Sequence, residues 1–214
     1  MQASTSDQRF DRVVGLGYSC QTAHQIRRIT GDETAYPLDW VVTYNTGLLT
    51  CIANDFDGFF DVEQLHRPTD GASVTHAVTD MEFPHEFSAD ADVVAEHANH
   101  AGRYAAVGRR WVDLMDGTDS LLFVREDRST EDIPRAAEAL RVALAARLTH
   151  QRFHLLYLTN RPADAADWGL DGITNGYLSQ LDPYEWQGDD RQWTRLLADF
   201  DIPRVAATAS ASSR

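Results

Sequence analysis

Three apolar runs separated by helical stretches constrain the fold more than any other feature of the sequence. Residues 12–16 (RVVGL), 120–125 (SLLFVR) and 153–159 (FHLLYLT) are short and largely apolar, as expected of strands buried on both faces. The intervening stretches 91–115 and 131–148 carry apolar residues at helical spacing. Strands that alternate with helices predict an α/β fold, with a mostly parallel sheet flanked by helices.

Shorter elements are expected in the rest of the chain. Apolar spacing predicts further helices over 20–29, 46–56 and 192–200, and short strands near 73–78 and 81–87. Two short strands so close together would pair as an antiparallel edge. An α+β architecture is therefore the alternative to the α/β fold.

The length of the chain predicts a single domain. A chain of 214 residues buries roughly 70% of its unfolded surface on folding, which is enough for one core without disulfides or metal. We expect this domain to span residues 12–205. Residues 1–11 are expected to form a flexible N-terminus. Residues 206–214, which are mostly small and polar, are expected to form a flexible tail.

The charge of the chain excludes several classes of function. With 33 acidic and 19 basic residues, the net charge is −14, and no basic stripe is present to bind nucleic acid or an anionic membrane surface. All the basic residues are arginine, which excludes chemistry that depends on a lysine, such as Schiff-base formation. We therefore expect no nucleic-acid partner and no membrane partner.

The sequence also predicts a cytoplasmic location. No segment approaches the roughly 18 consecutive apolar residues of a transmembrane helix. The first twelve residues lack the apolar segment of a signal peptide. The two cysteines, Cys20 and Cys51, are too few for a disulfide scaffold, and we expect both to be reduced.

The turn after the first predicted strand carries the clearest chemical signal. Gly17 permits a tight turn, and the next helix begins near Cys20, so the thiol lies at a helix N-terminus. Free N–H groups and positive potential at this position favour a thiolate and can hold an oxyanion. We expect a lowered pKa for Cys20, and an oxyanion site supported by the turn of Gly17, Tyr18 and Ser19.

Three other interpretations of this turn are open. A cysteine at a strand–helix junction often serves only in packing. Ser19 is an alternative nucleophile, although a thiol is the better nucleophile without assistance. Gly15 and Gly17 begin a dinucleotide-binding pattern, but Cys20 stands where the third glycine is required.

Five sequence blocks stand out together: LGYSC (16–20), PLDW (37–40), PHEF (84–87), RYAAVGRRW (103–111) and LLFVRED (121–127). This set of blocks resembles the DUF1796 family, which is described as papain-like cysteine peptidases. The family pattern has PFDW where this chain has PLDW, and HDF where it has HEF. The resemblance implies cysteine-dependent catalysis, and its papain-like description implies an α+β fold.

A cysteine nucleophile needs an imidazole in hydrogen-bond reach, oriented by a carboxylate or an amide. His85 is the best candidate for the base, because it matches the family's HDF block and lies beside Pro84, which restricts the backbone. His24 lies one turn after Cys20 on the same predicted helix and points along it, so it is the weaker candidate.

The orienting residue has three candidates. Asp39 is a carboxylate in an otherwise apolar segment, where catalysis or helix capping would explain its retention. Asp127 follows the strand LLFVR, and Asn160 follows the strand FHLLYLT. Both lie at strand ends, where site residues gather in α/β folds.

These residues predict a hydrolase or acyltransferase that cleaves an amide, ester or thioester through a Cys–His pair. The substrate is expected to be a small molecule or an acyl-carrier-type conjugate, and no cofactor or metal is expected. The alternative is a non-catalytic binding domain with a structural Cys20. The aromatic segment from Tyr177 to Trp193 either lines a substrate cleft or packs against the sheet.

Overall fold

The computed structural model describes residues 8–69, 73–90, 92–129, 132–148, 152–179 and 186–204. The tail predicted over 206–214, and the first seven residues of the predicted flexible N-terminus, lie outside the described residues. Within the described ranges, no helix is both long enough and apolar enough to cross a membrane.

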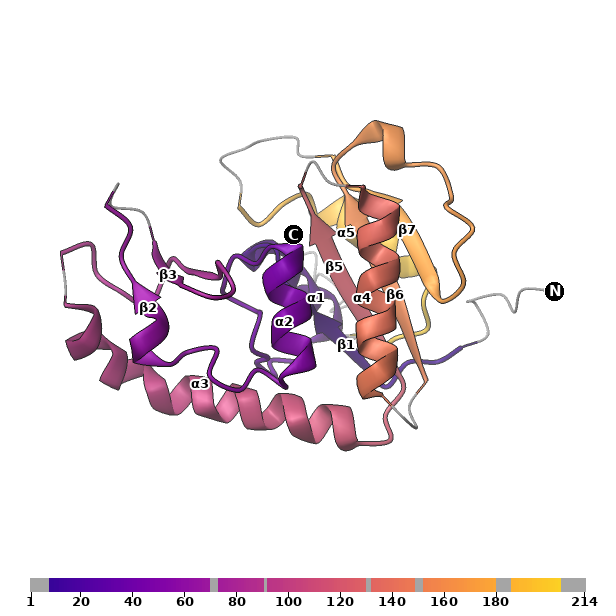
Figure 1. Cartoon of the computed structure of the whole chain (residues 1–214). Coiled ribbons are helices and arrows are strands. Elements are labelled where there is room, and N and C mark those ends of the chain that lie inside the picture. The colour runs from indigo at the N-terminus through magenta and orange to yellow at the C-terminus, as the bar shows by residue number, and fades with distance from the viewer. Residues whose placement is uncertain are drawn as a thin grey trace, which may run out of the picture.

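The main sheet has four strands in the order β1-β5-β6-β7 (Figure 1). They are β1 (Arg12–Gly15), β5 (Leu121–Asp127), β6 (Phe153–Thr159) and β7 (Ile173–Tyr177). All three neighbouring pairs are parallel. The predicted α/β fold is confirmed, and the α+β alternative is wrong for the main sheet, because parallel neighbours require crossovers rather than hairpins.

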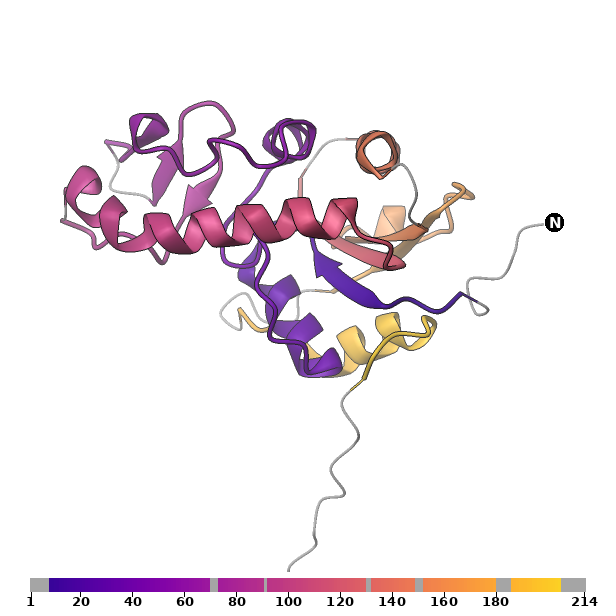
Figure 2. The ribbon, with the colours of Figure 1, turned by 90° about the horizontal axis from the view of Figure 1, so that it is seen from below.

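Five α-helices in the described residues surround this sheet. They are α1 (Cys20–Thr30), α2 (Asn45–Ala53), α3 (Val93–Asp116), α4 (Ile133–Arg147) and α5 (Asp190–Ala198). Figure 2 shows α1 and α5 on one side of the sheet and the other three helices on the opposite side. All five coincide, within a few residues, with helices predicted from the apolar spacing.

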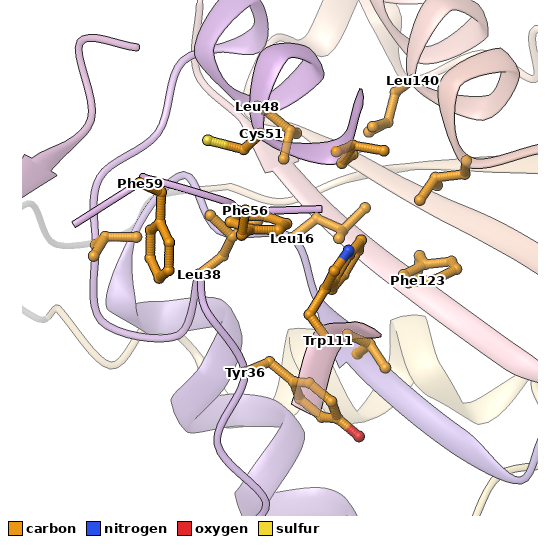
Figure 3. Close-up of a cluster of buried hydrophobic side chains, with 14 of the residues drawn as sticks. Leu16, Tyr36, Leu38, Leu48, Cys51, Phe56, Phe59, Trp111, Phe123 and Leu140 are labelled. Atoms are coloured by element: carbon orange, nitrogen blue, oxygen red, sulfur yellow. The ribbon is translucent and has the colours of Figure 1, made fainter. Parts of the chain in front are cut away.

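The two faces of the sheet bury different clusters, because successive strand residues point to opposite faces. Phe123 and Tyr157 belong to the cluster that also contains residues of α2, α3 and α4. Val124 and Leu156 belong to the cluster with residues of α1 and α5. In the first cluster, Trp111 of α3 packs edge-on against Phe56 (Figure 3).

A small antiparallel sheet lies beside α2, above the first half of α3 (Figure 1). Its strands are β2 (Leu65–His66), β3 (Val74–His76) and β4 (Glu82–Phe83). A single-turn 3₁₀ helix at Val62–Gln64 directly precedes β2, and another lies at Pro162–Asp164 after β6. β3 and β4 fall within the predicted short strands. β2 and β7 were not predicted from the sequence.

The folded region begins earlier than the predicted boundary at residue 12. Phe10 is fully buried in the cluster under α1 and α5, and its N–H donates to the carbonyl of Asp201. Arg9 forms a β-bridge with the same aspartate. Residues 9–11 are therefore part of the packed domain, held by the buried Phe10 ring and by backbone hydrogen bonds to Asp201 and Ser120.

Candidate active site

The turn between β1 and α1 has an unusual backbone. Gly17 and Tyr18 both adopt left-handed conformations, with φ of 73° and 71°. A Cβ atom on Gly17 would lie 2.8 Å from the hydroxyl oxygen of Thr43, so only glycine fits there. Tyr18 is strained at this φ, and its N–H donates to the same hydroxyl. The turn ends at Ser19, and Cys20 is the first residue of α1, as predicted.

The structure brings Cys20 and His85 together. The Cys20 Sγ lies 3.3 Å from His85 Nε2, which is within hydrogen-bond distance for sulfur. Cys20 is partly exposed and His85 is exposed, so the pair is accessible from solvent. The distance satisfies the geometric requirement for a nucleophile and its base.

A single β-bridge explains how residues so far apart in sequence meet. Val42 and Glu82 exchange two backbone hydrogen bonds of 3.0 Å, which joins the segment after α1 to strand β4. His85 follows β4 by two residues. The neighbouring Thr43 bonds to the turn that carries Cys20, so one short segment is attached to both halves of the site.

The environment of the Cys20 thiol differs from the prediction. Burial raises the pKa of Cys20 above its ordinary value, and the negative charges of Glu86 and Asp39 raise it further. The N–H of Cys20 itself lowers the pKa, but this effect is smaller than that of burial. The predicted lowering of the pKa is therefore wrong, because desolvation of the sulfur outweighs the hydrogen bond from the Cys20 N–H.

Ser19 is the N-cap of α1 in position but not in hydrogen bonding. Its side chain makes no capping hydrogen bond, and its hydroxyl donates to Glu126 Oε2 at 3.3 Å instead. Glu126 is buried, which raises its pKa, and its other oxygen accepts from Arg128. The first N–H groups of α1 are consequently not covered by the side chain that usually caps them.

Glu86, the residue after His85, is a buried carboxylate that sequence analysis did not single out. Its Oε1 accepts from Arg103 at 2.5 Å, and its Oε2 accepts from the backbone N–H of His85 at 3.3 Å. Tyr104 contacts the same carboxylate, and burial raises the pKa of that tyrosine. The HEF block contained the only sequence signal, since the family's HDF motif has a carboxylate at this position.

The predicted orienting residue Asp39 is engaged elsewhere. Its carboxylate accepts from the Arg27 guanidinium and from the N–H of Tyr36. Burial raises the pKa of Asp39 to about 6, against the opposing effects of these two donors. Within the described residues, the His85 ring has one hydrogen-bond partner, the Cys20 thiol, so Asp39 does not orient it through a direct hydrogen bond.

Neither alternative orienting residue lies against His85. Asp127 is the last residue of β5, and its carboxylate accepts from Tyr157, Asn45 and the N–H of Ser129. Asn160 is partly exposed just after β6, and among the described residues it makes no hydrogen bond to the thiol–imidazole pair. Both occupy strand ends as predicted, but at other positions along the sheet edge.

Arg125 connects strand β5 to the turn between β1 and α1 through hydrogen bonds. It is fully buried in β5, and its guanidinium donates to the carbonyl of Leu16 and to both oxygens of Thr43. A buried charge requires such partners. The same hydroxyl of Thr43 therefore accepts from Arg125 and from Tyr18, which couples the core of the sheet to the position of Cys20.

Cys51, the other cysteine, and His24, the histidine nearest to Cys20 in sequence, lie in environments different from those of Cys20 and His85. Cys51 is 3% exposed within α2, and burial raises its pKa to about 12. The His24 ring packs edge-on against Trp186, with ring centroids 5.1 Å apart. In the described residues, no group of three or more His, Cys, Asp or Glu side chains is arranged to hold a metal ion.

A cavity of about 590 Å³ lies between residues 55–61 and α3 in the described part of the chain. Neither Cys20 nor His85 lines it, although its lining residue Tyr104 contacts Glu86, the residue after His85.

The structure thus places a thiol at a helix N-terminus, with an imidazole in hydrogen-bond reach, at the carboxyl end of a parallel strand. The chain belongs to the family described as "Putative papain-like cysteine peptidase (DUF1796)", which matches residues 11–156. The predicted family resemblance is confirmed, and the matched region contains both Cys20 and His85.

One further relative is similar over nearly the whole chain. The chain is 21% identical to "Uncharacterized protein R408" of Acanthamoeba polyphaga mimivirus over 215 residues, which covers 86% of this chain and 96% of that protein. No solved structure matches the chain.

Proposed function

We propose that this protein is a cysteine-dependent hydrolase or acyltransferase that acts on an amide, ester or thioester bond. Cys20 is the nucleophile and His85 is the general base. The observation that carries the proposal is the 3.3 Å separation of Cys20 Sγ and His85 Nε2. The family description, which names cysteine peptidases, supports the same class of chemistry.

The raised pKa of Cys20 favours activation of the nucleophile by a general base. A thiol with a pKa above its ordinary value is protonated at neutral pH, so the resting form of Cys20 is the neutral thiol. His85 instead takes the proton as the sulfur attacks the substrate carbonyl and forms the carbon–sulfur bond. The protonated imidazole then gives this proton to the leaving amine, alcohol or thiol when the acyl–heteroatom bond breaks.

The second half of the reaction releases the acyl group. Water, or an amine or alcohol acceptor, attacks the thioester carbonyl after losing its proton to His85. The carbon–sulfur bond breaks, and the proton returns from the imidazole to Cys20. The acceptor decides between hydrolysis and acyl transfer.

The N-terminus of α1 is the proposed oxyanion site. The turn of Gly17, Tyr18 and Ser19 directs the chain into the helix, and the Ser19 hydroxyl bonds to Glu126 rather than to the helix. The first N–H groups of α1 can therefore donate to the negative oxygen that forms during attack. Both transition states of the reaction carry this charge.

Glu86 replaces Asp39, Asp127 and Asn160 as the residue that supports the base. It accepts from the backbone N–H of His85 and is itself held by Arg103. This fixes the loop that carries the imidazole without a hydrogen bond to the ring.

The proposed substrates are small molecules or acyl-carrier-type conjugates in the cytoplasm, where a thiol nucleophile remains reduced. The chain is acidic, with a net charge of −14, which disfavours nucleic acid and anionic membranes as partners.

Alkylation of the two cysteines at different pH values tests the proposal. Iodoacetamide labelling of each thiol is followed by mass spectrometry from pH 6 to pH 9 in the wild type, His85→Ala and His24→Ala. We expect wild-type Cys20 to react at pH 6–7. His85→Ala should lower the alkylation rate of Cys20 at least tenfold at pH 7, because without the base only the small fraction of the thiol that is already ionised reacts. His24→Ala retains the wild-type rate, and Cys51 stays unreactive in all three proteins.

A generic acyl donor extends the test to turnover. With p-nitrophenyl acetate, His85→Ala should lower the rate of acyl-enzyme formation by roughly a hundredfold or more, the usual effect of losing a general base. If Cys20 reacts at the same rate in the wild type and in His85→Ala at every pH, the proposal fails. The protein is then the alternative, a non-catalytic binding domain with a structural Cys20.

A further inference from the structure

Two tryptophans in the aromatic C-terminal segment have opposite environments. Trp193 of α5 is fully buried in the core, whereas Trp186 is 51% exposed. Packing against the sheet therefore explains Trp193 but leaves half of the Trp186 side chain in water. A large aromatic surface gains by contact with an apolar group, so the exposed half of the indole is available for such a contact.

Buried polar side chains of α1 hold the segment that carries Trp186. Gln21 Nε2 donates to the carbonyl of Trp186 at 3.1 Å, and Gln25 Nε2 donates to the carbonyl of Gln187 at 2.7 Å. Both donating side chains belong to buried residues. Gly188, with φ of 75°, packs so closely on Gln21 that a Cβ atom would lie 2.5 Å from its amide group. The indole is therefore anchored to the first turns of α1.

The indole lies on the face of α1 that carries the thiol. Trp186 packs edge-on against His24, with ring centroids 5.1 Å apart and an interplanar angle of 64°. His24 is four residues after Cys20, so the two side chains are neighbours on one face of the helix. Helical side chains lean towards the N-terminus, so the His24 ring leans towards Cys20, and Trp186 packs against that ring.

We propose that Trp186 is a specificity-determining residue that contacts an apolar, preferably aromatic, substituent of the substrate next to the reacting carbonyl. This inference rests on the proposed role of Cys20 as the nucleophile. His24 then positions the indole rather than activating the thiol. The protein selects acyl groups with a flat apolar substituent over small polar ones, because the indole face gains a stacking contact with the former alone.

Paired alkylating reagents test this selectivity without a known substrate. Iodoacetamide and N-benzyliodoacetamide deliver the same reactive group to Cys20, but only the second carries an aromatic ring. For each protein, the ratio of the benzyl rate to the iodoacetamide rate is divided by the same ratio for free cysteine. We expect this corrected ratio to fall roughly three- to tenfold in Trp186→Ala, the scale of one aromatic contact, and to be largely retained in Trp186→Phe.

A matched control removes an equally exposed apolar side chain elsewhere. Val142 is 59% exposed on α4, across the sheet from α1, and Val142→Ala should keep the wild-type ratio. An unchanged ratio in Trp186→Ala, with an unchanged urea unfolding midpoint, overturns the inference, as does an equal fall in Val142→Ala. Failure of the proposed function is separate, since it appears as equal iodoacetamide rates in the wild type and His85→Ala.

Discussion

Replacing Gly17 by alanine should destabilise the protein strongly, because two independent constraints act at this position. The residue has φ of 73°, in the left-handed region, and an added Cβ atom would lie 2.8 Å from the hydroxyl oxygen of Thr43. That hydroxyl cannot move freely. It accepts from the Tyr18 N–H at 3.2 Å and from Arg125 Nη1 at 2.7 Å.

The cost of Gly17→Ala follows from these contacts. The left-handed conformation costs roughly 1–2 kcal/mol for a residue with a Cβ atom. Displacing the Thr43 hydroxyl weakens one neutral hydrogen bond, worth roughly 0.5–1.5 kcal/mol, and one charged hydrogen bond, worth roughly 1.5–3 kcal/mol. With both hydrogen bonds lost, the free energy of unfolding should therefore fall by about 3–6.5 kcal/mol.

Urea denaturation measures this change, and Gly102→Ala is the matched control. Gly102 is exposed within α3, with nothing within 4 Å of its added Cβ atom, so alanine there should raise stability by roughly 0.5–1 kcal/mol. If Gly17→Ala lowers the free energy of unfolding by less than about 1 kcal/mol, the constrained turn described for this site is wrong.

Two other changes test the packing of the domain. Phe10→Ala should lower the free energy of unfolding by roughly 3–5 kcal/mol in urea titrations, and a change below about 1 kcal/mol would place this residue outside the core. Burial opposes ionisation of Asp127, but hydrogen bonds led by that of Tyr157 keep its pKa below the ordinary value. This stability is present above about pH 4 and is lost as pH falls through the folded pKa. Tyr157→Phe should cost roughly 1.5–3 kcal/mol at pH 7 and less at pH 3; an equal loss at both values would contradict this.

The strands and helices of the main sheet were predictable because their signals are local. β1, β5 and β6 are apolar runs, and α3 and α4 have clear helical spacing. The secondary structure of each segment therefore follows from its own residues, without knowledge of what packs against it. β7 was missed because ITNGY is largely polar, and its residue Gly176 has no side chain to contribute to an apolar pattern. Its strand conformation comes from pairing with β6.

The sequence by itself determined that Cys20 begins a helix after a strand, because a glycine-containing turn between two periodic segments is a local feature. Its family blocks also singled out His85. Only the tertiary structure decided that these two side chains meet, since the Val42–Glu82 bridge joins segments that no local pattern relates. Burial decided the rest: it raised the pKa of Cys20, and it distinguishes the exposed Trp186 from the buried Trp193 seven residues later. Burial depends on every segment packed around a residue, and therefore cannot be derived from the residues adjacent to it in the chain.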